Sequence, residues 1–148
     1  MSKNKFSIIT INLNNASGLS KTIDSVNRIK NEYIEFIVID GNSVDGSSVL
    51  LQNKIIDKYI VENDEGIYDA MNKGIGLARN DWVIFMNSGD VFAESFNPDI
   101  FHEIDNIDNY KLVYGDQMKR GKLLKSFPLF FTELGIIPGS HQSMFFRK

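Results

Sequence analysis

The chain has 148 residues, of which 43% are hydrophobic and 24% are charged, and its formal net charge is −3. This length and composition fit one globular domain with its own hydrophobic core, and they exclude a basic protein that holds nucleic acid through bulk charge. The chain has no cysteine, which excludes disulfides, thiolate metal sites and thiol nucleophiles and fits a reducing compartment such as the cytoplasm.

The first predicted element is a β-strand over residues 6–11, a continuous apolar run typical of a strand covered on both faces. The run is too short for a signal peptide, and no stretch approaches the ~20 apolar residues of a membrane-spanning helix, so we expect neither. A polar turn over residues 12–17 follows. The helix after it is predicted from apolar residues that recur on one side, at Leu19, Ile23, Val26 and Ile29.

The second predicted strand covers residues 36–39 and ends at Asp40. The loop after it, residues 41–46, is rich in the residues that form tight turns. Either Asp45 or Ser47 is suited to cap the helix that we expect next. The loop therefore has a structural explanation as well as a functional one.

A third short strand is predicted over residues 58–61, and residues 66–78 have the most regular helical pattern in the chain. Apolar residues form one stripe along this helix. Its other face presents Asp69, Asn72 and Lys73, which the helical spacing places close together.

The fourth predicted strand covers residues 82–86 and ends in the polar loop 87–90. A helix over residues 98–104 and a strand over residues 112–114 complete the regular pattern. Strands of this length alternating with helices predict an α/β fold with a mostly parallel central sheet and helices on both faces.

The pattern weakens from Gly121 onward. Phe127, Phe130 and Phe131 form an aromatic cluster that belongs either to the core or to the border of an acceptor groove. Residues 143–148 have the pattern of a strand without a closing turn or helix. We therefore expect the chain to stop before the fold is complete, and apolar surface at that end suggests a homodimer.

Three predicted strands end in polar loops, at residues 12–15, 40–45 and 87–90. If these strands are parallel, the three loops open on the same edge of the sheet. Ligands of open parallel sheets bind in the crevice beyond the carboxyl ends of the strands. The convergence of the loops therefore predicts a ligand site.

The residue types in these loops suit a nucleotide diphosphate. Asp40 can accept hydrogen bonds from a base or from ribose hydroxyls, and Asp90, beside Asn87, can hold the Mg²⁺ or Mn²⁺ ion that a diphosphate requires. Each has a structural alternative. Asp40 and Asp90 are also common in tight turns, and Asp64 is equally suited to cap the helix that follows it.

Four segments together resemble the family 2 glycosyltransferases of the GT-A fold, in particular bacterial enzymes that build surface polysaccharides. Residues 7–15, 38–46, 64–74 and 85–90 read SIITINLNN, VIDGNSVDG, DEGIYDAMNKG and FMNSGD. The third segment is long and specific, while the second and fourth contribute by their order and spacing. The resemblance implies a single Rossmann-like nucleotide-sugar-binding domain over residues 1–148.

In such a domain the end of the first strand and Asp40 hold the base and ribose, and Asp64 and Asn72 lie near the diphosphate or sugar. Residues 87–90 stand where the family carries its Asp-x-Asp metal motif, but Asn87 replaces the first Asp and only Asp90 remains. The predicted metal ligand is Asp90, with His141 either a second ligand or a packed side chain. The predicted donor-binding residues are Thr10, Asn12, Asn14, Asp40, Asn42, Asp64, Asn72 and Asn87.

The resemblance further implies transfer of a sugar from a nucleotide sugar, a UDP-sugar by expectation, to a saccharide or lipid-linked saccharide, with inversion at the anomeric carbon. Such an enzyme works in the cytoplasm, at the inner face of the membrane. Residues 138–147 resemble the stretch before the acceptor-side general base, which we therefore expect beyond Lys148.

Two other functions stay open at this point. The chain could be a fragment that binds the donor but transfers nothing, or a non-catalytic α/β nucleotide-binding module. Against a dinucleotide site, no Gly-x-Gly-x-x-Gly follows the first strand. Against a P-loop protein, no Gly-x-x-x-x-Gly-Lys-Ser/Thr occurs.

Overall fold

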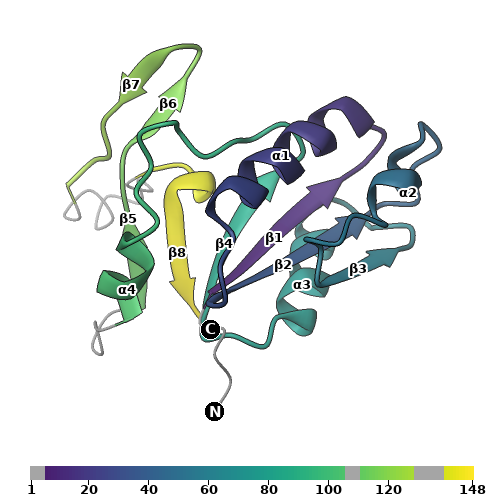
Figure 1. The fold of residues 1–148 in the computed structure, drawn as a ribbon, viewed down its shortest axis with the longest axis horizontal. Helices are drawn as coiled ribbons and strands as arrows, with labels where there is room; N and C mark the ends of the chain where they lie inside the picture. Colours follow the sequence, from purple (N-terminus) through teal and green to yellow (C-terminus); the bar gives the residue numbers. More distant parts are fainter. Residues whose placement is uncertain (1–5, 106–110, 129–138) are drawn as a thin grey trace.

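The computed structural model describes residues 6–105, 111–128 and 139–148, and its centre is a β-sheet (Figure 1). The strands of that sheet are β1 (Phe6–Asn12), β2 (Ile34–Asp40), β3 (Lys58–Val61), β4 (Trp82–Asn87), β5 (Leu112–Tyr114) and β8 (Met144–Arg147). Their order is β3-β2-β1-β4-β8-β5. β1 to β4 are parallel to one another, and β8 is antiparallel to both β4 and β5.

Helices cover both faces of this sheet. They are α1 (Ala16–Ile29), α2 (Ser47–Leu50), α3 (Ile67–Leu77), α4 (Ile100–Asp105) and the short 3-10 helix η2 (His141–Ser143). One core cluster lies beneath α1, and a second lies beneath α3. A side chain at Gly74 would collide with Ile9, so this glycine lets α3 approach β1 closely.

The strand order creates a switch point between β1 and β4. The chain builds outward from β1 through β2 to β3, and α3 then carries it back to the other side of β1. At a switch point, the connections that follow two adjacent parallel strands run in opposite directions. This leaves a crevice between the carboxyl ends of the two strands. The loops after β1 and β4 border this crevice.

The opposite edge of the sheet holds a buried charge pair. Glu35 on β2 is 2% exposed and lies 2.7 Å from Lys58 Nζ. Its other oxygen accepts hydrogen bonds from Ser7 Oγ at 2.8 Å and from Arg79 N at 3.0 Å. Burial would raise the pKa of Glu35, but these hydrogen bonds and the Lys58 cation outweigh it and lower the pKa below its ordinary value.

The predicted α/β fold, with a mostly parallel sheet and helices on both faces, is confirmed. The last predicted strand is β8, which lies between two partners inside the sheet. A hairpin of β6 (Gln117–Lys119) and β7 (Lys122–Leu124) was not predicted, because strands of three residues are too short to give a clear periodic pattern. Within the described residues, no helix is long and apolar enough to cross a membrane.

Candidate functional site

The site is built around Asn12, the last residue of β1, whose side chain is 4% exposed. Its amide nitrogen lies 2.6 Å from Asp40 Oδ2, 2.9 Å from Ser47 Oγ and 3.2 Å from Ser43 Oγ. Its amide oxygen accepts a hydrogen bond of 2.6 Å from Ser88 Oγ. One buried side chain therefore ties together the loops after β1, β2 and β4.

Asp40 is 1% exposed, so its carboxylate faces the protein rather than an open surface. It accepts hydrogen bonds from Ser43 N at 2.7 Å, Ser43 Oγ at 2.9 Å and the Asn12 amide. These donors are neutral, in contrast to the Lys58 cation beside Glu35. The geometry gives Asp40 a positioning role: it holds the β2 loop against the end of β1.

The loops after β1 and β2 contact each other at the surface. Asn14 N donates to Ser43 Oγ at 2.8 Å, and Asn14 Oδ1 accepts from Val44 N at 2.9 Å. Asn14 (φ 49°) and Asn42 (φ 65°) are in the left-handed region that asparagine tolerates. Both residues therefore form turns. The Asn42 side chain is exposed.

Asp45 joins the β2 loop to the start of α1. It accepts hydrogen bonds from Ser47 Oγ and from Ala16 N, both at 2.6 Å, and these lower the pKa of its carboxyl group. Asn15 caps the same helix, since its side chain accepts from Gly18 N at 3.1 Å. The amino end of α1 is thereby fixed beside the switch point.

Asp90 closes the turn that follows β4. Asn87 N donates to Asp90 Oδ2 at 2.8 Å, and Asp90 N donates to Asn87 O at 2.9 Å. Thr22 on α1 fixes this turn, because its hydroxyl donates to Asp90 O at 2.8 Å and accepts from Gly89 N at 2.9 Å. The turn is therefore rigidly held, with one Asp90 oxygen, Oδ1, outside these bonds.

The α3 segment contributes a charged cluster beside the β2 loop. Lys73 Nζ lies 2.7 Å from Asp64 Oδ1 and 3.0 Å from both Glu62 Oε1 and Asp69 Oδ2. The hydrogen bond to Asp64 is the largest cause that raises the pKa of Lys73. The other oxygen of Asp64, Oδ2, is the atom nearest to where a side chain at Gly41 would begin, at 3.0 Å. The predicted clustering on this helix holds for Asp69 and Lys73, with Asn72 exposed next to Lys73.

A cleft of about 1470 Å³ opens beside the β4 end of this site. Ile84, Met86 and Phe145 form an apolar floor on the sheet, and the β6–β7 hairpin lies across from it. The volume exceeds the ~300–1,000 Å³ of a typical small-molecule site, so the cleft has room for a sugar-sized ligand.

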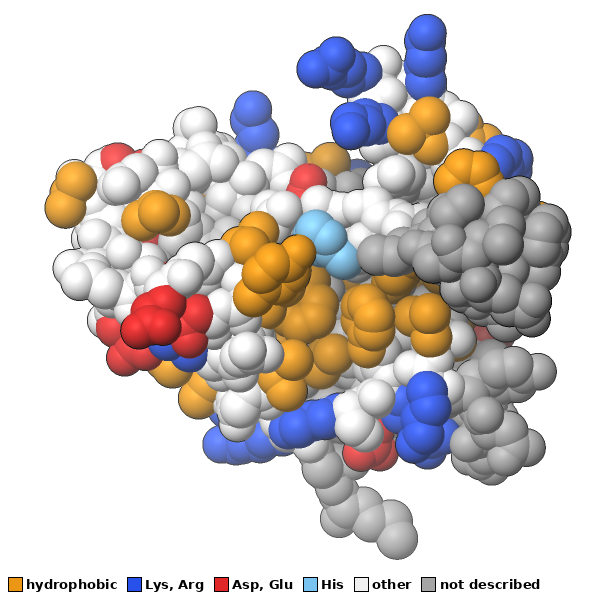
Figure 2. Space-filling view, turned by 180° about the vertical axis from the view of Figure 1, so that it is seen from behind, with side chains coloured by type: hydrophobic (Ala, Val, Ile, Leu, Met, Phe, Trp, Pro, Cys, Tyr) orange, Lys and Arg blue, Asp and Glu red, His pale blue; other side chains and the backbone are white. Residues whose placement is uncertain are grey.

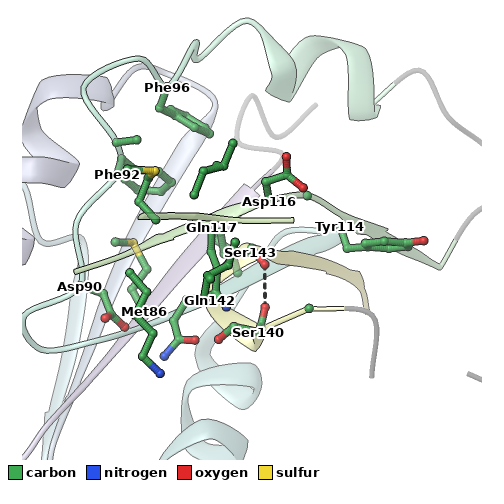
Figure 3. Close-up of a pocket in the computed structure, with 18 of the residues that line it drawn as sticks. Met86, Asp90, Phe92, Phe96, Tyr114, Asp116, Gln117, Ser140, Gln142 and Ser143 are labelled. Carbon is green, nitrogen blue, oxygen red and sulfur yellow. Dashed lines mark hydrogen bonds between the residues drawn. The ribbon is translucent and has the colours of Figure 1, made fainter. Parts of the chain in front are cut away.

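Figure 3 shows Asp90, Met86 and Gln142 toward one end of the cleft and Asp116 and Tyr114 toward the other. Asp90 therefore belongs both to the turn at the switch point and to the wall of the cleft. A ligand that spans from the strand ends into the cleft would pass this carboxylate.

The turn after β4 fits a divalent cation in part. Mg²⁺ and Mn²⁺ need only one or two carboxylates when phosphates and waters supply the other oxygens. Asp90 Oδ1 is one such oxygen, and Asn87 Oδ1 is buried without a hydrogen-bond partner among the described residues. Among residues 6–105, 111–128 and 139–148, no three His, Cys, Asp or Glu side chains form a ligand group.

Two predicted residues lie apart from the open site. Thr10 is fully buried within the sheet, and its hydroxyl has no partner in the described structure. His141 lies in η2, outside the lining of the cleft, and its Nε2 is likewise buried without a described partner. Their assignments to donor and metal stay predictions.

Sequence reasoning missed the hydroxyl groups that hold the site together. Ser43, Ser47 and Ser88 all bond to Asn12, and serine in a turn gives no signal by itself. Thr22 did carry a signal. It is a polar residue at helical spacing between Leu19 and Val26, on a face of α1 that is mostly apolar and also holds the buried Ser25.

The family model for glycosyl transferase family 2 matches residues 7–136. A "PGL/p-HBAD biosynthesis glycosyltransferase" from Mycobacterium bovis is 28% identical over 151 aligned positions that cover 97% of this chain. An uncharacterized glycosyltransferase from Mycobacterium tuberculosis is 39% identical over 97 positions, which cover 64% of this chain and 36% of that protein. This chain spans 59% of the M. bovis relative.

Solved structures share the fold. A mannosyltransferase from Pyrobaculum calidifontis, in complex with GDP-Man and Mn²⁺, superposes with a TM-score of 0.70 at 14% identity over 97% of this chain and 44% of that one. The TarS protein of S. aureus in complex with UDP gives a TM-score of 0.63 at 18% identity, covering 80% of this chain and 37% of the other. At these identities the likeness concerns the fold.

Proposed function

The chain belongs to glycosyl transferase family 2, and we propose that it binds the nucleotide-sugar donor in a transfer of that sugar to a saccharide or lipid-linked saccharide. The donor we expect is a UDP-sugar. The reaction forms a bond from an acceptor hydroxyl oxygen to the anomeric carbon as the nucleoside diphosphate leaves, with inversion at that carbon. The hydroxyl proton passes to a general base that we assign to no residue.

The observation that carries this proposal is the convergence of the loops after β1, β2 and β4 on Asn12. A nucleotide needs a rigid edge of backbone and side-chain groups, and this network fixes such an edge at the switch point of the sheet. Asn14 and Asn42 are exposed beside it, and Asp64 is partly buried in its ion pair with Lys73. These three residues are the candidates for the base, ribose and diphosphate.

We assign Asp90 to the donor diphosphate through Mn²⁺ or Mg²⁺. Such an ion would neutralise the phosphate charge that develops on the leaving group. Asp90 would supply Oδ1, with Asn87 as its neutral neighbour. Thr22 would act as a positioning residue, because it holds the turn that orients Asp90.

We place the acceptor in the cleft beyond Asp90 and the protein at the inner face of the membrane, where lipid-linked acceptors are found. Self-association into a homodimer belongs to the same proposal. Hydrophobic side chains gather in the middle of the face seen in Figure 2. Phe146, Ile75 and Leu77 are only partly buried in the core cluster beneath α3. A monodisperse monomer in sedimentation velocity would exclude the dimer.

Calorimetric titration with UDP and with GDP, each with and without Mn²⁺, tests the donor assignment. Tighter binding of UDP that requires Mn²⁺ is the expected result. An equal affinity for UDP with and without Mn²⁺ would show that no metal is needed, and the donor assignment would stand. Absence of binding by both nucleotides under all conditions would overturn the proposed function.

A further inference from the structure

The β6–β7 hairpin carries positive charge on a chain whose formal net charge is −3. Its basic residues are Lys119, Arg120, Lys122 and Lys125, and the one acidic residue of segment 116–125 is Asp116. Asp116 pairs with Lys125 at 2.7 Å. The other basic residues lie at the tip, and Figure 2 shows Lys and Arg side chains projecting at the upper right, beside hydrophobic ones.

Large apolar side chains are exposed on the same hairpin. Met118, Leu123 and Leu124 are 55%, 53% and 41% exposed. Met118 and Leu123 are directly opposite each other in the strand register, so they share one face. β6 and β7 form a sheet of two strands that projects from the body (Figure 1). Exposed apolar groups on such an element mark an interaction surface.

Two local costs accompany the charge at the tip. Lys119 is directly opposite Lys122, an arrangement in which like charges repel. Arg120 has φ 51° and Gly121 φ 73°, the left-handed pair of a two-residue hairpin turn that normally favours Asn-Gly. Arginine fits this conformation poorly because of its Cβ. Contact with a negatively charged surface would relieve the repulsion between the two lysines.

We propose that the β6–β7 hairpin docks the protein on an anionic lipid bilayer. The pair Lys119–Lys122 lies on the hairpin face opposite the pair Met118–Leu123, so the hairpin enters tip first. Lys119, Arg120 and Lys122 then reach the lipid phosphates, while Met118 and Leu123 enter the boundary between headgroups and acyl chains. Lysine is depleted at protein–protein interfaces, whereas clusters of basic residues beside apolar ones suit a membrane surface. The charge complementarity therefore favours the bilayer over a protein partner.

Membrane docking would serve the proposed sugar transfer, and in this respect the inference rests on the proposed function. Gln117 and Leu124 of the hairpin line the same cleft as Asp90, and so do Met118, Lys119 and Leu123, so the docking residues lie at the rim of the cleft. Docking through the tip would hold the cleft at the bilayer surface, where a lipid-linked acceptor presents its sugar. Membrane binding itself does not depend on catalysis, so the two proposals can be tested separately.

The test is co-sedimentation of the whole chain with phosphatidylcholine vesicles and with vesicles that also contain phosphatidylglycerol. We expect binding to the anionic vesicles only. The variant Lys119→Ser/Lys122→Ser should bind about 25-fold more weakly, at about fivefold for each removed cation. The matched control Lys21→Ser/Lys54→Ser removes the same charge from exposed positions elsewhere and should bind like the wild type.

Two further variants separate charge from folding. Arg120→Asn keeps the turn and should weaken binding about fivefold. Met118→Ser/Leu123→Ser keeps the charges and should also weaken binding. Equal losses in the hairpin and control variants, or no binding to anionic vesicles, would overturn the proposal. If the chain forms a dimer that the hairpin variants disrupt, and does not bind vesicles, the proposal is overturned and the hairpin is a dimer interface. UDP titration of the same variants should be unchanged, and vesicle binding without UDP binding would refute only the proposed function.

Discussion

Strand β2 carries a buried carboxylate at each end, and the two have different partners. Glu35, at the amino edge, is neutralised by Lys58 and held by Ser7 and Arg79 N. Asp40, at the carboxyl edge, receives neutral donors from Asn12 and Ser43. The amino edge is a closed structural network. At the carboxyl edge the network fixes three loops around a surface that a ligand can reach.

The largest effect on stability is expected at the closed network. Glu35→Ala leaves the Lys58 cation without its partner and should lower the free energy of unfolding by about 3 kcal/mol, because breaking a buried pair exposes its full desolvation cost. Denaturant unfolding measures this value. UDP affinity of the remaining folded protein should match the wild type, and a selective loss of UDP affinity would contradict the separation of the two edges.

An intermediate effect is expected at Asp40. Asp40→Ala leaves the Ser43 N–H without its acceptor and removes one of the three acceptors around the Asn12 amide, so it should cost about 2 kcal/mol and weaken UDP binding by loosening the loop. Asp40→Asn keeps the size and one acceptor oxygen, and it should cost less. If both variants unfold like the wild type, Asp40 does not hold the loop, and a direct contact with the donor becomes the better explanation.

Acidification should lower the folding stability contributed by carboxyl groups at both edges of the sheet. Hydrogen bonds hold the pKa of Glu35 and of Asp45 below their ordinary values. Each group therefore contributes stability above its unfolded pKa of about 4, and that stability is lost as the pH falls through the folded pKa. Thermal melts from pH 6 down to acid should show this loss. Glu35→Gln should be less stable at neutral pH yet lose less on acidification, whereas an unchanged acid response would assign the loss to other carboxyl groups.

The smallest effect on stability is expected at Asp90. Asp90→Asn keeps an oxygen that can accept the hydrogen bond from Asn87 N, so the free energy of unfolding should change by less than about 1 kcal/mol. Asp90→Ala loses that bond as well and should cost more. A large loss of stability in Asp90→Asn would mean that this carboxylate is structural.

The sequence predicted the strands of the α/β core because their buried residues form continuous apolar runs, as in β1 and β2. It also predicted that three loops would converge, since parallel strands place their carboxyl ends together. It did not predict that Asp40 is enclosed, because its burial depends on Asn12 from another strand and on the local loop fold that turns Ser43 back onto it. The β6–β7 hairpin was missed because each strand has three residues, too few for a periodic pattern, and the adjacent leucines of β7 interrupt the alternation.

Phe127 shows that an aromatic residue cannot be assigned to the hydrophobic core from the sequence alone. It is 51% exposed and lines the cleft, which agrees with the alternative that it borders a groove. Phe130 and Phe131 lie outside the described residues. Hydrophobicity alone does not separate the two roles, because a ligand-binding groove and a core both use apolar side chains.

The most direct test of the account compares UDP titrations of the wild type and Asp90→Asn, with and without Mn²⁺. We expect Mn²⁺ to tighten UDP binding to the wild type and the variant to lose this gain, on the order of tenfold, with a melting temperature close to that of the wild type. An equal response to Mn²⁺ in both proteins would contradict the metal-holding role of Asp90. UDP binding by neither protein would contradict the donor site itself.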